Sequence, residues 1–141
     1  MTFYKLKNIL YFLLMFSLIP CFCGSVGAEI CNCQSCSDCN SKLNKDSCSI
    51  VILTADIINH RGTCINDSGN FSNKIFDCQK HTIAGDKGGE DYGIYLNGKS
   101  GNTIRNCVII DFWDGISLQD SSNNNIINNT VSNMVNGVGI W

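Results

Sequence analysis

Two carboxylates and four aromatic rings lie close together in the C-terminal half of this 141-residue chain. They are Asp111, Asp114, Phe112, Trp113, Tyr92 and Tyr95. Paired carboxylates serve as acid and base, or as acid and nucleophile, in glycoside hydrolysis, and an aromatic ring offers a flat apolar face to a sugar. The two aspartates are therefore candidate catalytic residues, and the four rings are candidate ligand-binding residues.

A simpler interpretation of the same residues is structural, and we favour it. Aspartate is a common turn residue, and Asp111 and Asp114 both precede Gly115. Phe112 and Trp113 would then cover the outer surface or lie under a loop. On this interpretation the chain alone is not expected to be an enzyme.

The N-terminal segment has the pattern of a secretory signal peptide. Lys5 and Lys7 precede an apolar run over residues 9–19, and small residues lead up to Ala28. Cleavage there would remove residues 1–28, leave no membrane span and change the formal net charge from −2 to −4. We expect a secreted or cell-surface protein, and its negative charge argues against a nucleic-acid partner.

An internal repeat sets the expected fold. Gly-Ile-x-Leu occurs at 93–96 and 115–118, and a variant follows at 137–140, with a spacing of 22 residues. A second motif, Asn-x-Ile-x-Asp/Asn-Cys/Thr, begins at Asn73, Asn102 and Asn125. A unit of this length holds two or three short strands separated by Asn, Gly, Asp and Ser turns, and helices are not indicated.

These repeats predict an all-β, right-handed parallel β-helix of about four coils over residues 48–141. It would follow the signal peptide and a Cys-rich N-terminal cap over residues 29–47. Residues 81–92 should project as a loop. The last repeat reaches Trp141 without a polar terminal coil, so we expect the solenoid to continue beyond the given chain.

Stacked coils place equivalent side chains above one another at about 4.8 Å. Alignment of the second motif predicts that Ile75, Ile104 and Ile127 form one inward ladder. The turn ladders should contain Asn102 and Asn125. In the clearest coil the expected inward side chains are Ile104, Val108, Ile110, Ile116 and Leu118, with Arg105, Ile109 and Ser117 facing outward.

The same alignment places Cys78 over Cys107, at a separation that a disulfide tolerates. We predict that they bond, or at least touch; the alternative is two free, packed thiols. Six further cysteines should pair among themselves, in a connectivity that the sequence leaves open: Cys31, Cys33, Cys36, Cys39, Cys48 and Cys64. The first four lie close enough together to bind zinc, but an oxidising compartment favours a disulfide-bonded cap, and we expect neither a metal nor a cofactor.

The combination of Gly-Ile-x-Leu with Asn-x-Ile-x-Asn-Cys over residues 48–141 resembles the repeats of NosD-like proteins and of the carbohydrate-binding and sugar-hydrolase group. This resemblance implies the fold more strongly than the function, because such coils carry enzymes, adhesins and binding modules alike. NosD-like proteins are linked with copper-enzyme maturation, which suggests a copper site from His81 and Met134. We do not favour that site, because two coils separate the residues.

We therefore expect an exported β-helix surface module that binds glycans or serves as a cell-envelope scaffold without catalysis. Its partners would be carbohydrate or cell-envelope components. The alternative is the N-terminal part of a β-helix polysaccharide hydrolase or lyase, whose carboxylates lie partly beyond Trp141.

Overall fold

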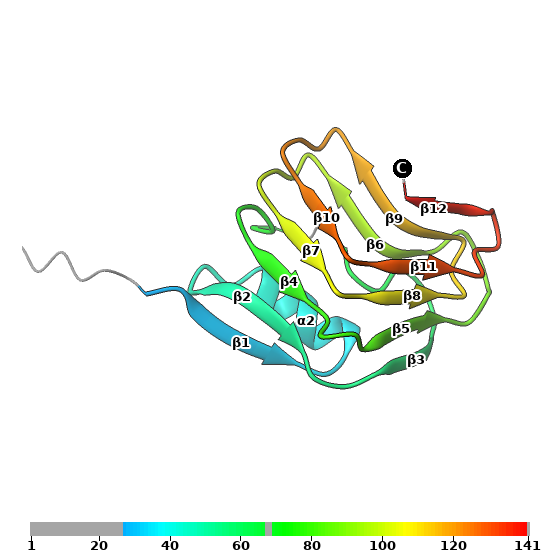
Figure 1. Ribbon diagram of the computed structural model, residues 1–141, viewed down its shortest axis with the longest axis horizontal. Helices are drawn as coiled ribbons and strands as arrows, with labels where there is room; N and C mark the ends of the chain where they lie inside the picture. Colours follow the sequence, from blue (N-terminus) through cyan, green and yellow to red (C-terminus); the bar gives the residue numbers. More distant parts are fainter. Residues whose placement is uncertain (1–26, 67–68, 141) are drawn as a thin grey trace, which may run out of the picture.

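The computed structural model describes residues 27–66 and 69–140 as a parallel β-solenoid (Figure 1). The first sheet contains β1 (Glu29–Cys33), β2 (Cys48–Leu53), β4 (Ile75–Asp77), β7 (Thr103–Arg105) and β10 (Asn125–Ile127). The second contains β3 (Ile57–His60), β5 (Thr82–Gly85), β8 (Val108–Ile110) and β11 (Thr130–Ser132). The third contains β6 (Tyr92–Asn97), β9 (Asp114–Gln119) and β12 (Val138–Ile140).

The expected all-β parallel β-helix is confirmed, since neighbouring strands within each sheet are parallel and come from successive turns. The five strands of the first sheet correspond to five turns, one more than expected, because β1 from the Cys-rich segment adds a turn. Strand β5 occupies part of the segment expected to be a loop. The expected signal peptide falls almost entirely outside the described residues. No helix in the described ranges is long and apolar enough to cross a membrane.

Helix α2 (Cys36–Leu43) lies in the Cys-rich segment before the repeats, and the repeat pattern gave no indication of it. Ser35 caps it, with its hydroxyl accepting a hydrogen bond from the Asp38 backbone N–H at 3.3 Å. Asp38 lies in the first turn and Lys42 in the last, where each charge complements the helix dipole. The Ser35 cap and the two charges therefore favour a helix in this segment.

Helix α2 covers the beginning of the third sheet. Asn40 Nδ2 donates to the Cys64 carbonyl at 2.7 Å, and its Oδ1 accepts from the Asn66 backbone N–H at 3.1 Å. The intervening Ile65 pairs with Ile94 of β6. Because a sheet edge exposes unpaired backbone groups, the Asn40 amide acts in place of a neighbouring strand.

The inward ladder of the first sheet is shifted from the predicted one. Phe76 pairs with Ile104, and Ile104 pairs with Ile126. Ile75 instead pairs with Thr103, and Ile127 is 51% exposed. The predicted ladder of Ile75, Ile104 and Ile127 is therefore wrong, although the stacking that it assumed is present.

The error comes from asparagines with two different roles at adjacent positions. Asn73 and Asn123 adopt left-handed backbone at the turn, with φ of 56° at each. Asn102 and Asn124, one position further along the motif, use their side chains: Asn124 Oδ1 accepts from the Asn102 backbone N–H at 2.9 Å. The amide ladder thus contains Asn102 and Asn124, and the predicted pairing with Asn125 is wrong.

A similar shift affects β8. Ile109 is fully buried, whereas Val108 and Ile110 are half-buried, so the predicted alternation is reversed. Asn106 has φ of 56° in the turn between β7 and β8, which resets the alternation. Ser117, expected to face outward, is only 2% exposed.

The repeated glycines make room for neighbouring side chains. A Cβ on Gly93 would lie 2.4 Å from Ile109 Cγ2, and one on Gly115 would lie 2.1 Å from Val131 Cγ1. The third member of the column is Gly139, because Ile140 pairs with Ile116. The motif copy assigned to Gly137 is thus wrong by two residues.

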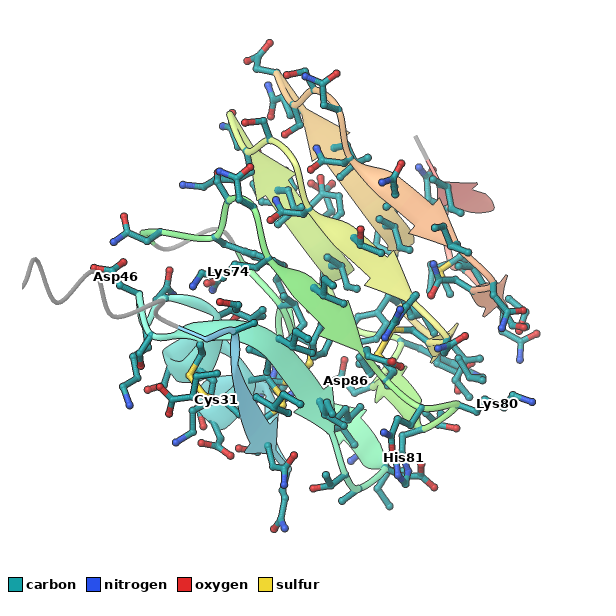
Figure 2. All side chains as sticks on the ribbon, turned by 60° about the vertical axis from the view of Figure 1, so that its left-hand side comes forward. Cys31, Asp46, Lys74, Lys80, His81 and Asp86 are labelled. Atoms are coloured by element: carbon teal, nitrogen blue, oxygen red, sulfur yellow. A yellow bond between two sulfur atoms is a disulfide. The ribbon has the colours of Figure 1, made fainter. Side chains whose placement is uncertain are left out.

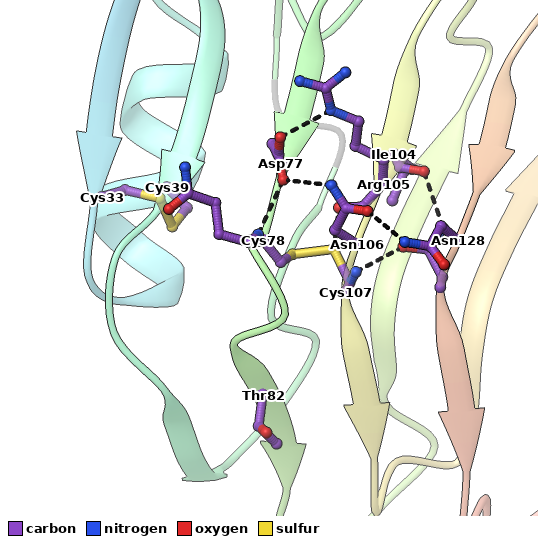
Figure 3. The surroundings of a disulfide bond; sticks show 12 residues. Cys33, Cys39, Asp77, Cys78, Thr82, Ile104, Arg105, Asn106, Cys107 and Asn128 are labelled. Atoms are coloured by element: carbon purple, nitrogen blue, oxygen red, sulfur yellow. Dashed lines mark hydrogen bonds and ion pairs between the residues drawn. A yellow bond between two sulfur atoms is a disulfide. The ribbon is translucent and has the colours of Figure 1, made fainter.

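Four disulfides fasten the first turns together: Cys31–Cys48, Cys33–Cys39, Cys36–Cys64 and Cys78–Cys107. The last joins the turns after β4 and β7 (Figure 3). It is the pair that the stacked repeats predict, and the other six cysteines pair among themselves. Three of the four bonds involve α2 or β1, so covalent links concentrate where the solenoid begins.

Candidate functional site

A pair of tyrosine rings lies on the third sheet. Tyr92 and Tyr95 of β6 have ring centroids 5.0 Å apart, with planes tilted by 32°. Both are half-buried. Tyr95 Oη donates to Gln119 Oε1 of β9 at 2.6 Å. The arrangement combines apolar ring surface with a polar edge, and Gln119 was not singled out from the sequence.

The other two predicted aromatic residues separate. Trp113 is half-buried in the turn before β9, and its backbone N–H donates to the Asp91 carbonyl at 3.0 Å. This hydrogen bond joins Trp113 to Asp91, which immediately precedes Tyr92 and lies one turn earlier in the solenoid. Phe112 is only 1% exposed and belongs to the core. Trp113 therefore lies in the turn next to Asp91, whereas the Phe112 ring does not face solvent.

Both candidate catalytic carboxylates are engaged with protein groups. Asp114 is 3% exposed, and its Oδ1 accepts from Asn136 Nδ2 at 3.2 Å. Asp111 has φ of 63°, and its Oδ1 lies 3.3 Å from Lys87 Nζ. A turn conformation and inter-turn contacts account for both residues without invoking an acid and base pair.

Asp77 is the centre of a structural polar network (Figure 3). Its carboxylate accepts from Arg105 Nε at 2.8 Å, from Asn106 Nδ2 at 3.0 Å and from the Gln79 backbone N–H at 2.9 Å. Burial raises the pKa of Asp77, but the hydrogen bonds from Asn106, Gln79 and Arg105 outweigh it and hold the pKa below its usual value. Asp77 is therefore a charged link between turns and is not poised to donate a proton.

Lys74 borders a polar hollow of about 430 Å³ lined by Asp46, Ser49, Gly69, Asn70, Ser72, Asn73 and Lys74. Figure 2 shows Lys74 and Asp46 at one end of the first sheet, and Lys80 and His81 at the other. The Lys74 ammonium donates to the carbonyls of Lys45 at 2.8 Å and Cys48 at 2.7 Å. Burial lowers the pKa of Lys74. Because the ammonium already donates to two carbonyls, it joins turns and is poorly placed to recognise a ligand.

Sulfur and imidazole donors meet where α2 joins the solenoid. Ligand atoms of Cys36, His60 and Cys64 all lie within 4.8 Å of one another. Within the described ranges one other group of this size occurs, formed by Glu29, Cys31 and Cys48. The four cysteines of these two groups are in disulfides.

Sequence reasoning missed His60. Its spacing of four from Cys64 was readable, but the proximity of Cys36 depends on the placement of α2. The histidine and methionine that the sequence suggested for copper have other surroundings: His81 Nδ1 lies 2.9 Å from Asp56 Oδ1, and Met134 packs against the hydrophobic core.

Residues 27–141 match the model of a family described as periplasmic copper-binding protein (NosD). The chain belongs to the NosD family. No curated protein and no solved structure matches it. The expected resemblance to NosD-like β-helix proteins is therefore confirmed. Membership of this periplasmic family, together with four disulfides, indicates that the NosD-family chain is extracytoplasmic.

Proposed function

We propose that this NosD-family chain is a non-catalytic, extracytoplasmic module that binds carbohydrate or another envelope component through the third sheet. The observation that carries the proposal is the tyrosine pair of β6, with its polar edge at Gln119. Two half-buried rings at a shallow angle form an open platform. A ligand face can stack on such a platform while its hydroxyls exchange hydrogen bonds with the edge.

The engaged carboxylates support binding without cleavage. Glycoside hydrolysis needs one carboxyl group to give a proton and another to act as base or nucleophile. Asp111 faces Lys87, and Asp114 is buried with Asn136 as a partner. Neither arrangement leaves a carboxyl group directed at a ligand on the tyrosine platform.

Binding to immobilised oligosaccharides tests this function. Tyr95→Ala should reduce binding about tenfold or more, because it removes both stacking area and the hydroxyl that orients Gln119. Tyr95→Phe keeps the ring and separates stacking from hydrogen bonding. Ile58→Ala is the matched control, because Ile58 is 75% exposed but belongs to β3 of the second sheet.

Equal binding by the wild-type, Tyr95→Ala and Ile58→Ala chains would exclude the tyrosine platform as the contact surface. Release of shortened glycan by the wild-type chain would instead favour the hydrolase or lyase alternative. That activity should then be lost in Asp111→Asn or Asp114→Asn.

Copper binding is a second candidate function, and it is favoured by a different observation. The description of the family includes copper binding. The group formed by Cys36, His60 and Cys64 would offer copper the His60 imidazole and, only after reduction of the Cys36–Cys64 disulfide, two thiolates. This candidate can be tested independently of the tyrosine platform, because the donors lie beside α2 and not on β6.

A further inference from the structure

We propose that Asn136 is a site of spontaneous modification, at which the side-chain amide is converted to a carboxylate through a cyclic imide with the backbone nitrogen of Gly137. The site lies in the turn between β11 and β12. The conversion requires water and no partner protein. It goes beyond the carbohydrate-binding and copper-binding functions above and depends on neither.

The chain contains two Asn-Gly pairs, Asn97-Gly98 and Asn136-Gly137. Imide formation is easiest in this dipeptide, because glycine has no side chain to hinder the attack of its nitrogen and its backbone adapts to the ring. Both asparagines are exposed, and φ is positive at both glycines, 65° at Gly98 and 80° at Gly137. A Cβ built on either glycine would meet no atom of the described residues within 4 Å. The two pairs therefore share their local chemistry and their exposure to water.

The two pairs differ in how the attacking nitrogen is held. The Gly98 N–H donates to the Gln119 carbonyl in the next turn at 2.9 Å, where β6 and β9 pair in register. The Gly137 N–H donates within its own turn, to the Met134 carbonyl at 3.3 Å. Attack on the side-chain carbon requires this N–H to leave its acceptor and lose its proton. Because release at Gly98 also opens the β6–β9 ladder, the first pair should react about tenfold more slowly than the second.

Asn136 is also held beside a buried carboxylate. Its Nδ2, the nitrogen that leaves, donates to Asp114 Oδ1 at 3.2 Å. Its backbone N–H donates to the Trp113 carbonyl at 3.1 Å. Both partners belong to the preceding turn, so the reacting residue stays against the start of β9 while the glycine nitrogen that follows it is held by the longer bond.

The reaction needs no oxidant or reductant. The Gly137 nitrogen forms a bond to Asn136 Cγ, the Cγ–Nδ2 bond breaks, and Nδ2 leaves as ammonia with the proton that the glycine nitrogen gives up. Water then opens the cyclic imide. Opening at Cγ gives aspartate, and opening at the main-chain carbonyl gives isoaspartate, in which the main chain runs through the side-chain carbon. Each route consumes one water molecule and releases one molecule of ammonia.

Either product weakens the last described turn. A carboxylate at position 136 faces Asp114, which is 3% exposed, and two close carboxylates repel each other where water screens them poorly. Isoaspartate also lengthens the main chain between β11 and β12 and displaces the pairing of β12 with β9. Strand β9 contains Gln119, the partner of Tyr95. Modification of Asn136 therefore affects the strand next to the tyrosine pair.

Incubation of the full, disulfide-bonded chain in heavy-oxygen water tests the site. Peptide mapping by mass spectrometry should detect incorporated heavy oxygen at Asn136 about tenfold faster than at Asn97. In urea that unfolds the chain, the two rates should differ by less than about threefold, because both glycine N–H groups have then lost their acceptors. Absence of incorporation at Asn136, equal rates in the folded chain, or the same tenfold ratio in urea would overturn the proposal.

Thermal unfolding tests the consequence of the new charge. Asn136→Asp should lower the Tm by about 4 °C or more, whereas Asn136→Ser, which removes the amide without adding charge, should lower it by about half as much. Asp114→Asn in the Asn136→Asp chain exchanges the amide and the carboxylate and should restore most of the Tm. Asn97→Asp is the matched control at the other pair and should change the Tm by less than about 2 °C. Equal Tm values for Asn136→Asp and Asn136→Ser, or no recovery in the double variant, would overturn the repulsion between positions 114 and 136.

Discussion

Replacement of Gly93 by alanine should destabilise the solenoid, because the added methyl group enters space that the next turn already fills. Its Cβ would lie 2.4 Å from Ile109 Cγ2 and 2.7 Å from the Gly115 carbonyl oxygen. Ile109 is fully buried, so it cannot move aside without leaving its preferred rotamer, which costs roughly 1 kcal/mol. The carbonyl belongs to the β6–β9 ladder, and separating these strands adds to the cost. Overpacking of this kind totals about 2–3 kcal/mol.

Gly139→Ala is the matched control, because Gly139 occupies the equivalent position at the last described turn. Its nearest atom to an added Cβ is Val131 Cγ1 at 3.8 Å, an ordinary contact. Neither Gly93 nor Gly139 has a positive φ, so alanine is compatible with both backbones. Gly139→Ala should therefore leave the free energy of unfolding unchanged or raise it by about 0.5 kcal/mol, through the unfolded chain.

Urea unfolding under non-reducing conditions, followed by far-UV circular dichroism, measures the difference. We expect the two variants to differ by about 3 kcal/mol, or by roughly 10 °C in Tm. In the background Ile109→Ala, the Gly93→Ala substitution should cost at least about 1 kcal/mol less, since one of the two clashes is gone. Stabilities within about 0.5 kcal/mol of each other for Gly93→Ala and Gly139→Ala would refute the space-filling role of the glycine column.

Three further perturbations test the links between turns. Asn102→Ala should cost about 3 kcal/mol in urea unfolding, because the buried amide bonds two backbone groups, while Asn125→Ala, at an exposed position on extended backbone, should cost about 0.5 kcal/mol or less. Replacing Cys78 and Cys107 by alanine should cost about 3.5 kcal/mol, since their disulfide closes a separation of 29 residues; no loss of stability in the same assay would contradict this. The pKa of Asp77 is lowered on folding, so its contribution to stability is complete above the unfolded pKa of about 3.9 and is lost as the pH falls through the folded value. Acid titration should show a shallower loss of stability below about pH 4 in Asp77→Asn than in the wild-type chain.

The repeat motif was sufficient to predict the architecture, because stacking requires only that apolar positions recur at roughly regular intervals. It was not sufficient to predict register. Asn102 and Asn124 differ by 22 residues, while Gly115 and Gly139, which also stack, differ by 24. The last turn therefore contains two extra residues between these positions, and the period alone does not reveal where such residues fall. Helix α2 was missed because a solenoid repeat contains no information about the segment that covers its first edge.

In the candidate sites, too, the sequence predicts which residues share a motif or a strand but not which residues meet across neighbouring strands. Cys78 and Cys107 could be paired from sequence because both follow copies of one motif. Tyr92 and Tyr95 could be grouped because they belong to one strand. The contact of Gln119 with Tyr95 instead depends on the pairing of β6 with β9.

The group formed by Cys36, His60 and Cys64 depends on packing even more strongly. His60 lies beside Cys36 because the Asn40 amide and the Cys36–Cys64 disulfide both hold α2 against the segment that pairs with β6. A motif search treats Cys36 as part of a cysteine-rich run and His60 as an isolated residue. If Asn40 covers the sheet edge, Asn40→Ala should cost about 1 kcal/mol or more in urea unfolding of the oxidised chain, because it removes the hydrogen bonds to the Cys64 carbonyl and the Asn66 backbone N–H. An unchanged free energy of unfolding in Asn40→Ala would show that this amide does not stabilise the start of the third sheet, and the packing argument for α2 would fail.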